Sequence, residues 1–275
     1  MEKLDRLGWA DGFSFKSYGL QVGVRFSVSD PRVMGCFKAL LPPGWEPLES
    51  PIVDHLYSVI VGGNSLRSNL RNFSVVYWDA GLIARSKDFE GMLGAFESHL
   101  QLTIAEWSPR LVFVHAGVVE WSGSAIVIPG LSFSGKTTLV KHLVEAGAKY
   151  YSDEYAVLDG RGRVHPYPRP LGVRPPDATS TEKIPVEQLG GSTGSKPLPV
   201  KLIISTSYKV GATWRPRELS AGSGVLELLS HTVGARRQPR LALATLPKVV
   251  ASATILKGPR GEASSLAGTI LERVG

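Results

Sequence analysis

The chain has 275 residues, 43% of them hydrophobic and 20% charged, which is ordinary for a soluble globular protein of one large domain or two small ones. No apolar run approaches the roughly 20 residues of a membrane span, and no signal-peptide core follows residues 1–6. The lone cysteine, Cys36, excludes an internal disulfide and a zinc site made of cysteines. These features favour a cytoplasmic protein without a membrane partner.

The net charge of +7 is unevenly distributed. Residues 201–275 hold 11 Lys and Arg against 4 Asp and Glu, so the first 200 residues balance at 20 against 20. A basic C-terminal part suits an anionic substrate, although a solvated basic surface explains it equally well. Because no aromatic–basic stacking pattern accompanies the charge, the sequence does not favour a nucleic acid partner.

Residues 1–105 are predicted to form a smaller α+β region that binds a substrate or partner. The runs 20–28, 55–61 and 73–78 alternate with a period of two, which predicts strands. A helix is expected from residue 87 to about 107, where apolar residues recur at helical spacing. This region shows no catalytic signature of its own.

Residues 106–275 are predicted to form the catalytic domain. The strand 111–121 turns at Ser122 and Gly123 into a second strand, 124–128, which predicts a tight hairpin. Residues 130–138 then match G-x-x-x-x-G-K-[ST], the phosphate-binding loop, and the helix 139–147 follows. Such a loop binds nucleotide phosphates with backbone N–H groups and the positive end of the helix dipole. The predicted nucleotide-binding residues are Gly130, Ser132, Phe133, Ser134, Gly135, Lys136, Thr137 and Thr138.

Two acids interrupt the next predicted strand, residues 149–159. Asp153 follows Thr137 by 16 residues, and from there it could reach a metal ion or the γ-phosphate. Glu154, if the segment is extended, points to the opposite side. A turn residue and a solvated acid are the respective alternatives. The turn 159–162 then closes a further hairpin to residues 164–167.

Three further groups of basic residues are candidates for the functional site. His115 lies in an apolar strand, where a satisfied core histidine is the alternative. Arg169 and Arg174 suit bidentate phosphate or carboxylate contacts, unless they are surface arginines. Arg236, Arg237 and Arg240 form a second cluster with the same alternative.

The remainder of the chain carries no recognised motif. Residues 175–199 are rich in Pro, Gly, Ser and Thr and are expected to form a mobile loop that orders on ligand binding. A buried strand is predicted at 201–205, a helix around 224–230 and a closing helix at 262–274.

Together these pieces resemble the C-terminal catalytic domain of the HPr kinase/phosphorylase family, whose wider relatives include the ATP-dependent phosphoenolpyruvate carboxykinases. The resemblance runs from about residue 113 to 173. It comprises the Val-His-Gly strand (114–117), the hairpin, the loop 130–138, the acid pair 153–154 and the signature segment 169–173. It implies a mixed-sheet α/β fold with a phosphate-binding loop, and marks the chain as a divergent member.

The resemblance also implies roles. Asp153 would be the general base, with His115 beside it, and Arg169 would be catalytic together with Lys136. Thr137, Asp153 and Glu154 would hold Mg²⁺. Glu154 stands where the family has aspartate, and Tyr167 stands where the family has a metal-binding glutamate.

The predicted function is therefore an ATP-dependent kinase that phosphorylates a hydroxyl. The acceptor is either a serine of a peptide or protein, such as a ribosomal peptide precursor, or a small hydroxylated metabolite. The alternative is a nucleotide-binding switch or scaffold with little transfer activity. A carboxykinase-like lyase fits less well because the chain is short. GTP in place of ATP, reverse phosphorylase activity and a homo-oligomer are left open by the sequence.

Overall fold

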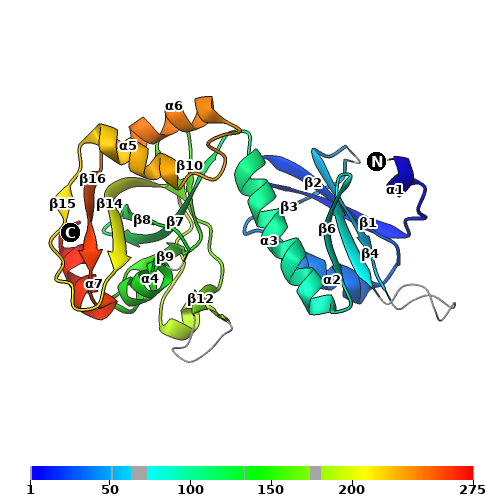
Figure 1. The fold of residues 1–275 in the computed structure, drawn as a ribbon, viewed down its shortest axis with the longest axis horizontal. Helices are drawn as coiled ribbons and strands as arrows, with labels where there is room; N and C mark the ends of the chain where they lie inside the picture. The colour runs from blue at the N-terminus through cyan, green and yellow to red at the C-terminus, as the bar shows by residue number, and fades with distance from the viewer. Residues whose placement is uncertain (1, 51, 63–72, 133, 174–180, 275) are drawn as a thin grey trace. The chain divides into compact units, whose positions relative to one another are not determined.

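The computed structural model describes residues 2–50, 52–62, 73–132, 134–173 and 181–274. The chain forms two compact units, Met1–Pro109 and Arg110–Gly275, which are described separately (Figure 1). Both combine helices with mixed sheets, so the predicted mixed α/β fold class is confirmed.

The first unit is built on a six-stranded sheet of order β3-β1-β2-β4-β5-β6, in which only β2 and β4 pair in parallel. The predicted strands correspond to β2, β4 and β5, and the predicted helix to α3. The short elements β1, β3, β6 and α2 were not predicted. The bounds are α1 (Glu2–Asp5), β1 (Asp11–Ser17), β2 (Leu20–Phe26), α2 (Pro31–Lys38), β3 (Glu46–Leu48), β4 (His55–Ile60), β5 (Ser74–Trp78), β6 (Gly81–Ser86) and α3 (Phe89–Trp107).

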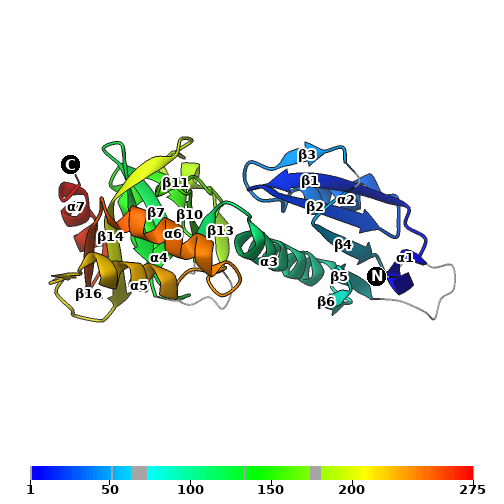
Figure 2. The same ribbon diagram turned by 90° about the horizontal axis from the view of Figure 1, so that it is seen from above.

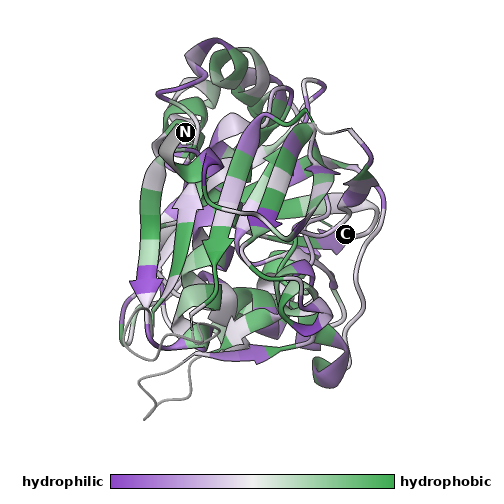
Figure 3. Ribbon diagram, turned by 90° about the vertical axis from the view of Figure 1, so that its right-hand side faces the viewer, coloured by the Kyte–Doolittle hydropathy of each residue, from purple (hydrophilic) through white to green (hydrophobic). Residues whose placement is uncertain are grey.

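Figure 2 shows α3 beside the sheet of this unit. In the core, the ring of Phe96 from α3 contacts the rings of Phe37 and Tyr57, and buried aliphatic side chains of the sheet and of α3 accompany them. Alternating green and purple along its strands in Figure 3 reflect the period-two pattern of the sequence. Asp88 caps α3 by accepting hydrogen bonds from the backbone N–H groups of Glu90 and Gly91. Because apolar residues recur every four positions, α3 buries one stripe: Met92, Phe96, Leu100 and Ile104.

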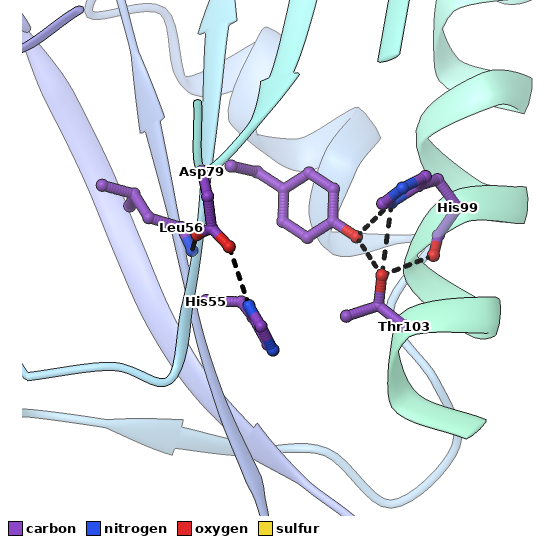
Figure 4. A network of polar contacts seen from close by, with 6 residues as sticks. His55, Leu56, Asp79, His99 and Thr103 are labelled. Atoms are coloured by element: carbon purple, nitrogen blue, oxygen red, sulfur yellow. Dashed lines mark hydrogen bonds and ion pairs between the residues drawn. The ribbon is translucent and has the colours of Figure 1, made fainter. Parts of the chain in front are cut away.

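Two histidine-centred groups lie near this core (Figure 4). The ring of His55 bonds through Nδ1 to Asp79 at 2.9 Å. The Tyr57 hydroxyl lies 2.8 Å from Nδ1 of His99 and 2.9 Å from the Thr103 hydroxyl, which donates to the His99 carbonyl oxygen. Since Thr103 uses its hydrogen there, Tyr57 must donate to Thr103 and His99 to Tyr57. This directed chain connects β4 to α3 and assigns a hydrogen to Nδ1 of His99.

The first unit is expected to lose stability in mild acid. Burial lowers the pKa of His99 below its usual 6.5, so in the window just below pH 6.5 the unfolded chain binds more protons than the folded one. Stability therefore falls as the pH drops from 6.5 through the folded pKa. Chemical denaturation between pH 7.5 and 5 measures this slope, and His99→Gln should flatten it. An identical slope in the variant would assign the acid sensitivity to another group.

The second unit is a three-layer structure around a mixed sheet of order β11-β10-β7-β8-β14-β16-β15, with β9 also paired to β7. The strands β8, β14 and β16 run parallel, so their carboxyl ends share one edge. Helices α4 and α7 pack on one face and α5 and α6 on the other (Figure 1). The sheet bounds are β7 (Val112–Trp121), β8 (Ser124–Pro129), β9 (Lys149–Ser152), β10 (Tyr155–Leu158), β11 (Arg163–His165), β14 (Leu198–Tyr208), β15 (Arg217–Glu218) and β16 (Thr254–Arg260).

The other elements of this unit are four helices, a short hairpin and a 3₁₀ turn. They are α4 (Lys136–Glu145), β12 (Leu171–Val173), β13 (Glu182–Ile184), η1 (Val186–Leu189), α5 (Ala221–Ser230), α6 (Pro239–Val250) and α7 (Ala263–Glu272). The predicted hairpins are confirmed as β7–β8 and β10–β11, whereas α6 and β16 were not predicted. Across the described ranges, no helix combines the length and the apolar character that crossing a bilayer requires.

The prediction of an open loop at 175–199 is wrong for the part that the structure describes. Residues 174–180 lie outside the described residues, but β13 pairs with β12, and Val186 is buried against α4. Tyr150 pairs with this segment through both backbone groups, its N–H donating to Ser192 and its carbonyl accepting from Gly194. Gly194 permits close packing here, because a Cβ on it would meet the Tyr151 ring.

Candidate phosphoryl-transfer site

The loop 130–138 connects the carboxyl end of β8 to α4, and both motif glycines are required by its geometry. A Cβ on Gly130 would lie 2.6 Å from the Ser134 hydroxyl oxygen. Gly135 has a φ of +85° and precedes the first residue of α4, where no side chain caps the helix. The loop thereby presents the free N–H groups of a helix N-terminus. Phe133, one of the predicted binding residues, lies outside the described residues.

The ammonium group of Lys136 is buried at this loop. Its Nζ donates to the Leu131 carbonyl oxygen at 2.8 Å, and the residue is only 7% exposed. Burial lowers the pKa of Lys136, against the opposing effect of the nearby carboxylates of Glu154 and Asp153. The buried hydroxyl of Ser134 has no hydrogen-bond partner within the described part of the chain. A cation folded back onto a carbonyl, beside an unsatisfied hydroxyl and an uncapped helix, fits an anion.

Asp153 lies between β9 and β10, and the structure brings it to Thr137 as the sequence suggests. The Thr137 hydroxyl donates to Oδ2 of Asp153 at 3.2 Å, and the Gly172 N–H donates to the same oxygen at 3.3 Å. Burial raises the pKa of Asp153, although these hydrogen bonds and one from Tyr150 oppose the shift. A carboxyl group with a raised pKa is suited to accept a proton near neutral pH.

Tyr150 is a site residue that the sequence analysis missed. Its hydroxyl lies 2.9 Å from Oδ1 of Asp153 and 2.8 Å from the carbonyl oxygen of Arg169. One hydroxyl hydrogen cannot fully satisfy both acceptors. When Asp153 is protonated the conflict disappears, because the acid donates to Tyr150 and Tyr150 donates to Arg169. The surroundings of Asp153 therefore accommodate both of its protonation states.

His115 lies near Glu154, the second residue of the acid pair. Nε2 of His115 is 3.7 Å from Oε1 of Glu154, which is too long for a hydrogen bond. Burial lowers the pKa of His115 to about 4, with Lys136 and His231 acting in the same direction, so the imidazole is neutral at pH 7. The pKa of Glu154 is raised by burial and by Asp153, but 42% of its side chain is exposed, which weakens the effect.

The predicted arginines differ in whether they interact with the residues of the site. Arg169 contributes its backbone carbonyl to Tyr150, and its charge acts on Glu154. Arg174 lies outside the described residues. The side chains of Arg236, Arg237 and Arg240 are exposed at and after the turn that follows α5. The buried ring of Tyr167 contacts the rings of Phe113 and Tyr155. Since the residue is a tyrosine, position 167 supplies no carboxylate.

A second polar group, also missed, lies at the same edge of the sheet on the face covered by α5. Glu227 accepts a hydrogen bond from Ser205 on β14 and pairs with Lys257 on β16 at 2.6 Å. His231 follows α5, and its carbonyl oxygen accepts the His115 N–H at 2.8 Å, while the His115 carbonyl accepts the Gly130 N–H at 3.2 Å. This bonding holds the start of the loop beside residue 231. No local sequence pattern identifies this second group, because its members Ser205, Glu227, His231 and Lys257 are spread over more than 50 positions.

The side chains at the loop fit a magnesium ion shared with a phosphate. Thr137 and Asp153 offer adjacent hard oxygen atoms, and Glu154 follows in the chain. Within the described ranges, no three His, Cys, Asp or Glu residues gather into a metal-binding group. Mg²⁺ is usually bound by one or two carboxylates together with substrate phosphates and water, and the Asp153 carboxylate could serve as such a ligand.

Comparison with known proteins finds similarity among solved structures. No family model and no curated protein matches the chain. Among solved structures, the chain is similar to the HPr(Ser) kinase/phosphatase from Coxiella burnetii, with a TM-score of 0.33 and 14% identity over 59% of this chain and 95% of that one. A TM-score of 0.33 is a loose overlap, and any functional assignment depends on the side chains of the site.

Proposed function

We propose that the protein is a kinase that transfers the γ-phosphate of ATP to a hydroxyl group. The contact between Thr137 and Asp153 beside the buried Lys136 carries this proposal, because it unites a phosphate-binding loop with a carboxyl group of raised pKa. Binding an anion requires only the loop and Lys136. A buried acid directly against the loop is the additional feature that transfer requires.

Each residue of the site has its own role in the proposed reaction. Lys136 exchanges its bond to Leu131 for the β- and γ-phosphates, and the N–H groups at the start of α4 bind the β-phosphate. Asp153 accepts the proton of the acceptor hydroxyl while Tyr150 and Gly172 hold its carboxyl group in place. Neutral His115 and Arg169 line the acceptor side. Thr137, Asp153 and Glu154 would hold Mg²⁺, which would supply neutralisation of the charge on the transferring phosphoryl group.

The acceptor in this proposal is a serine of a peptide or protein, or a small hydroxylated metabolite, with the first unit contributing to its recognition. The basic character of residues 201–275 favours an acceptor with anionic groups. The nucleotide is ATP or GTP, because the loop motif recognises phosphates and not the base.

Mass spectrometry tests the proposal directly. Serine-containing peptides and hydroxylated metabolites are incubated with the protein, Mg²⁺ and ATP or GTP, and the expected product carries one added phosphoryl group. Tight nucleotide binding without transfer to any acceptor would instead favour a nucleotide-binding switch or scaffold. The absence of a carboxylate at Tyr167 is the observation that keeps this second function in view.

A further inference from the structure

Arg260, the last residue of β16, holds a buried positive charge directly behind the loop. It is only 2% exposed. Its Nη2 donates to the carbonyl oxygen of Gly135 at 2.8 Å, and its Nη1 donates to the carbonyl oxygen of Gly261 at 2.9 Å. The third nitrogen, Nε, is buried and has no hydrogen-bond partner among the residues that the structure describes.

No carboxylate neutralises this charge at close range. In the described part of the chain, no acidic group lies within ion-pair distance of the Arg260 guanidinium. The charge does interact with Glu262, but that residue is exposed and accepts a hydrogen bond from Tyr208. An arginine stays protonated in proteins, and burying a cation without a counter-ion is costly. The guanidinium also lies over the Tyr208 ring, 5.7 Å from its centroid, which offsets part of this cost. The folded chain thus keeps, at the base of the loop, a buried cation that these described residues compensate only in part.

The bond to Gly135 connects this cation to the inside of the loop. The carbonyl group of Gly135 and the N–H group of Lys136 belong to the same peptide unit. A charged donor on the carbonyl polarises that unit and makes the N–H a stronger donor, because successive hydrogen bonds reinforce one another. The guanidinium also fills the space that a Cβ on residue 135 would occupy, at 2.5 Å, and so supports the left-handed conformation there.

We propose that Arg260 is a positioning residue for the nucleotide, acting through the Gly135–Lys136 peptide to strengthen phosphate binding. This inference rests on the proposed function, because the anion that would compensate Arg260 is the phosphate chain bound at the loop. It assigns a task to a residue more than 120 positions from the motif. If Arg260 only holds the loop in its folded position, replacing it would lower the stability of the protein and leave its affinity for nucleotide unchanged.

The experiment compares Arg260→Met, Arg260→Lys and the control Arg217→Met, which alters an exposed arginine on the neighbouring β15. Calorimetric titration with ADP and Mg²⁺ gives the affinity, and thermal unfolding without nucleotide gives the stability. We expect Arg260→Met to weaken ADP binding about tenfold or more, as the loss of a charge-assisted hydrogen bond predicts. Its melting temperature should be unchanged or higher, because an apolar chain replaces an unpaired buried charge. Arg260→Lys should bind with intermediate affinity, and the control should match wild type.

The possible results separate the two proposals. Wild-type affinity in both Arg260 variants would overturn this inference and leave the kinase proposal standing. A fall in affinity that only accompanies an equal loss of stability in both variants would also overturn it, in favour of a clamp. Failure of the wild-type protein to bind ADP or ATP would overturn both proposals.

Discussion

Replacing Lys136 with alanine is expected to weaken ATP binding about 10- to 100-fold and to abolish phosphoryl transfer. The reason is that the phosphate chain loses its one buried ammonium partner at the start of α4, and hydrogen bonds to charged groups contribute roughly 1.5–3 kcal/mol each. Calorimetry with ATP and Mg²⁺ measures the affinity, and the mass-spectrometric assay measures the transfer.

Lys141→Ala is the matched control for this experiment. Lys141 lies on the same helix but pairs with Glu145 one turn later, with about a third of its side chain exposed. It should bind ATP like wild type. Equal affinities for Lys136→Ala and Lys141→Ala would show that the loop does not bind the phosphates.

Asp153→Asn is expected to leave nucleotide affinity nearly normal and to reduce transfer by about 10²-fold or more, the usual contribution of a general base. The surroundings accept an amide well. Its oxygen can receive the hydrogen bonds from Thr137 and Gly172, and its NH₂ can donate to Tyr150, which then donates to Arg169. The variant therefore removes the base while keeping the fold, and single-turnover kinetics at saturating ATP isolates the chemical step.

Glu154→Gln provides the contrast. Its main effect should be a higher Mg²⁺ concentration for half-maximal rate, because in the proposed reaction Glu154 would bind the metal and not accept the proton. Full turnover in Asp153→Asn at saturating substrate would move the base elsewhere. His115 would then be the next residue to test, since its imidazole is neutral at pH 7.

The parts of the fold that follow local rules could be predicted from the sequence. The hairpin of β7 and β8 has a two-residue turn with Gly123 in the left-handed region, which local sequence encodes. Likewise, the acid pair 153–154 falls between β9 and β10 because charged residues interrupt an apolar run. The same local reading placed Lys136, Thr137 and Asp153 at one site.

The parts that depend on distant contacts could not be predicted. Tyr150 reads as a core aromatic residue, and only the fold shows that its hydroxyl meets Asp153. Arg260 reads as one basic residue among many in a basic region. The segment 181–197 reads as a loop because β13 and η1 are short, and tertiary packing against α4 overrides its composition.

The hydrogen bonding of residue 115 makes the identity of its side chain exchangeable. Both backbone groups of His115 are bonded, to residue 231 on one side and to the first glycine of the loop on the other. Because main-chain atoms join these three segments, the connection does not depend on the imidazole. If the proposed kinase activity holds, replacements at 115 are therefore expected to alter acceptor choice more than the connection between these segments.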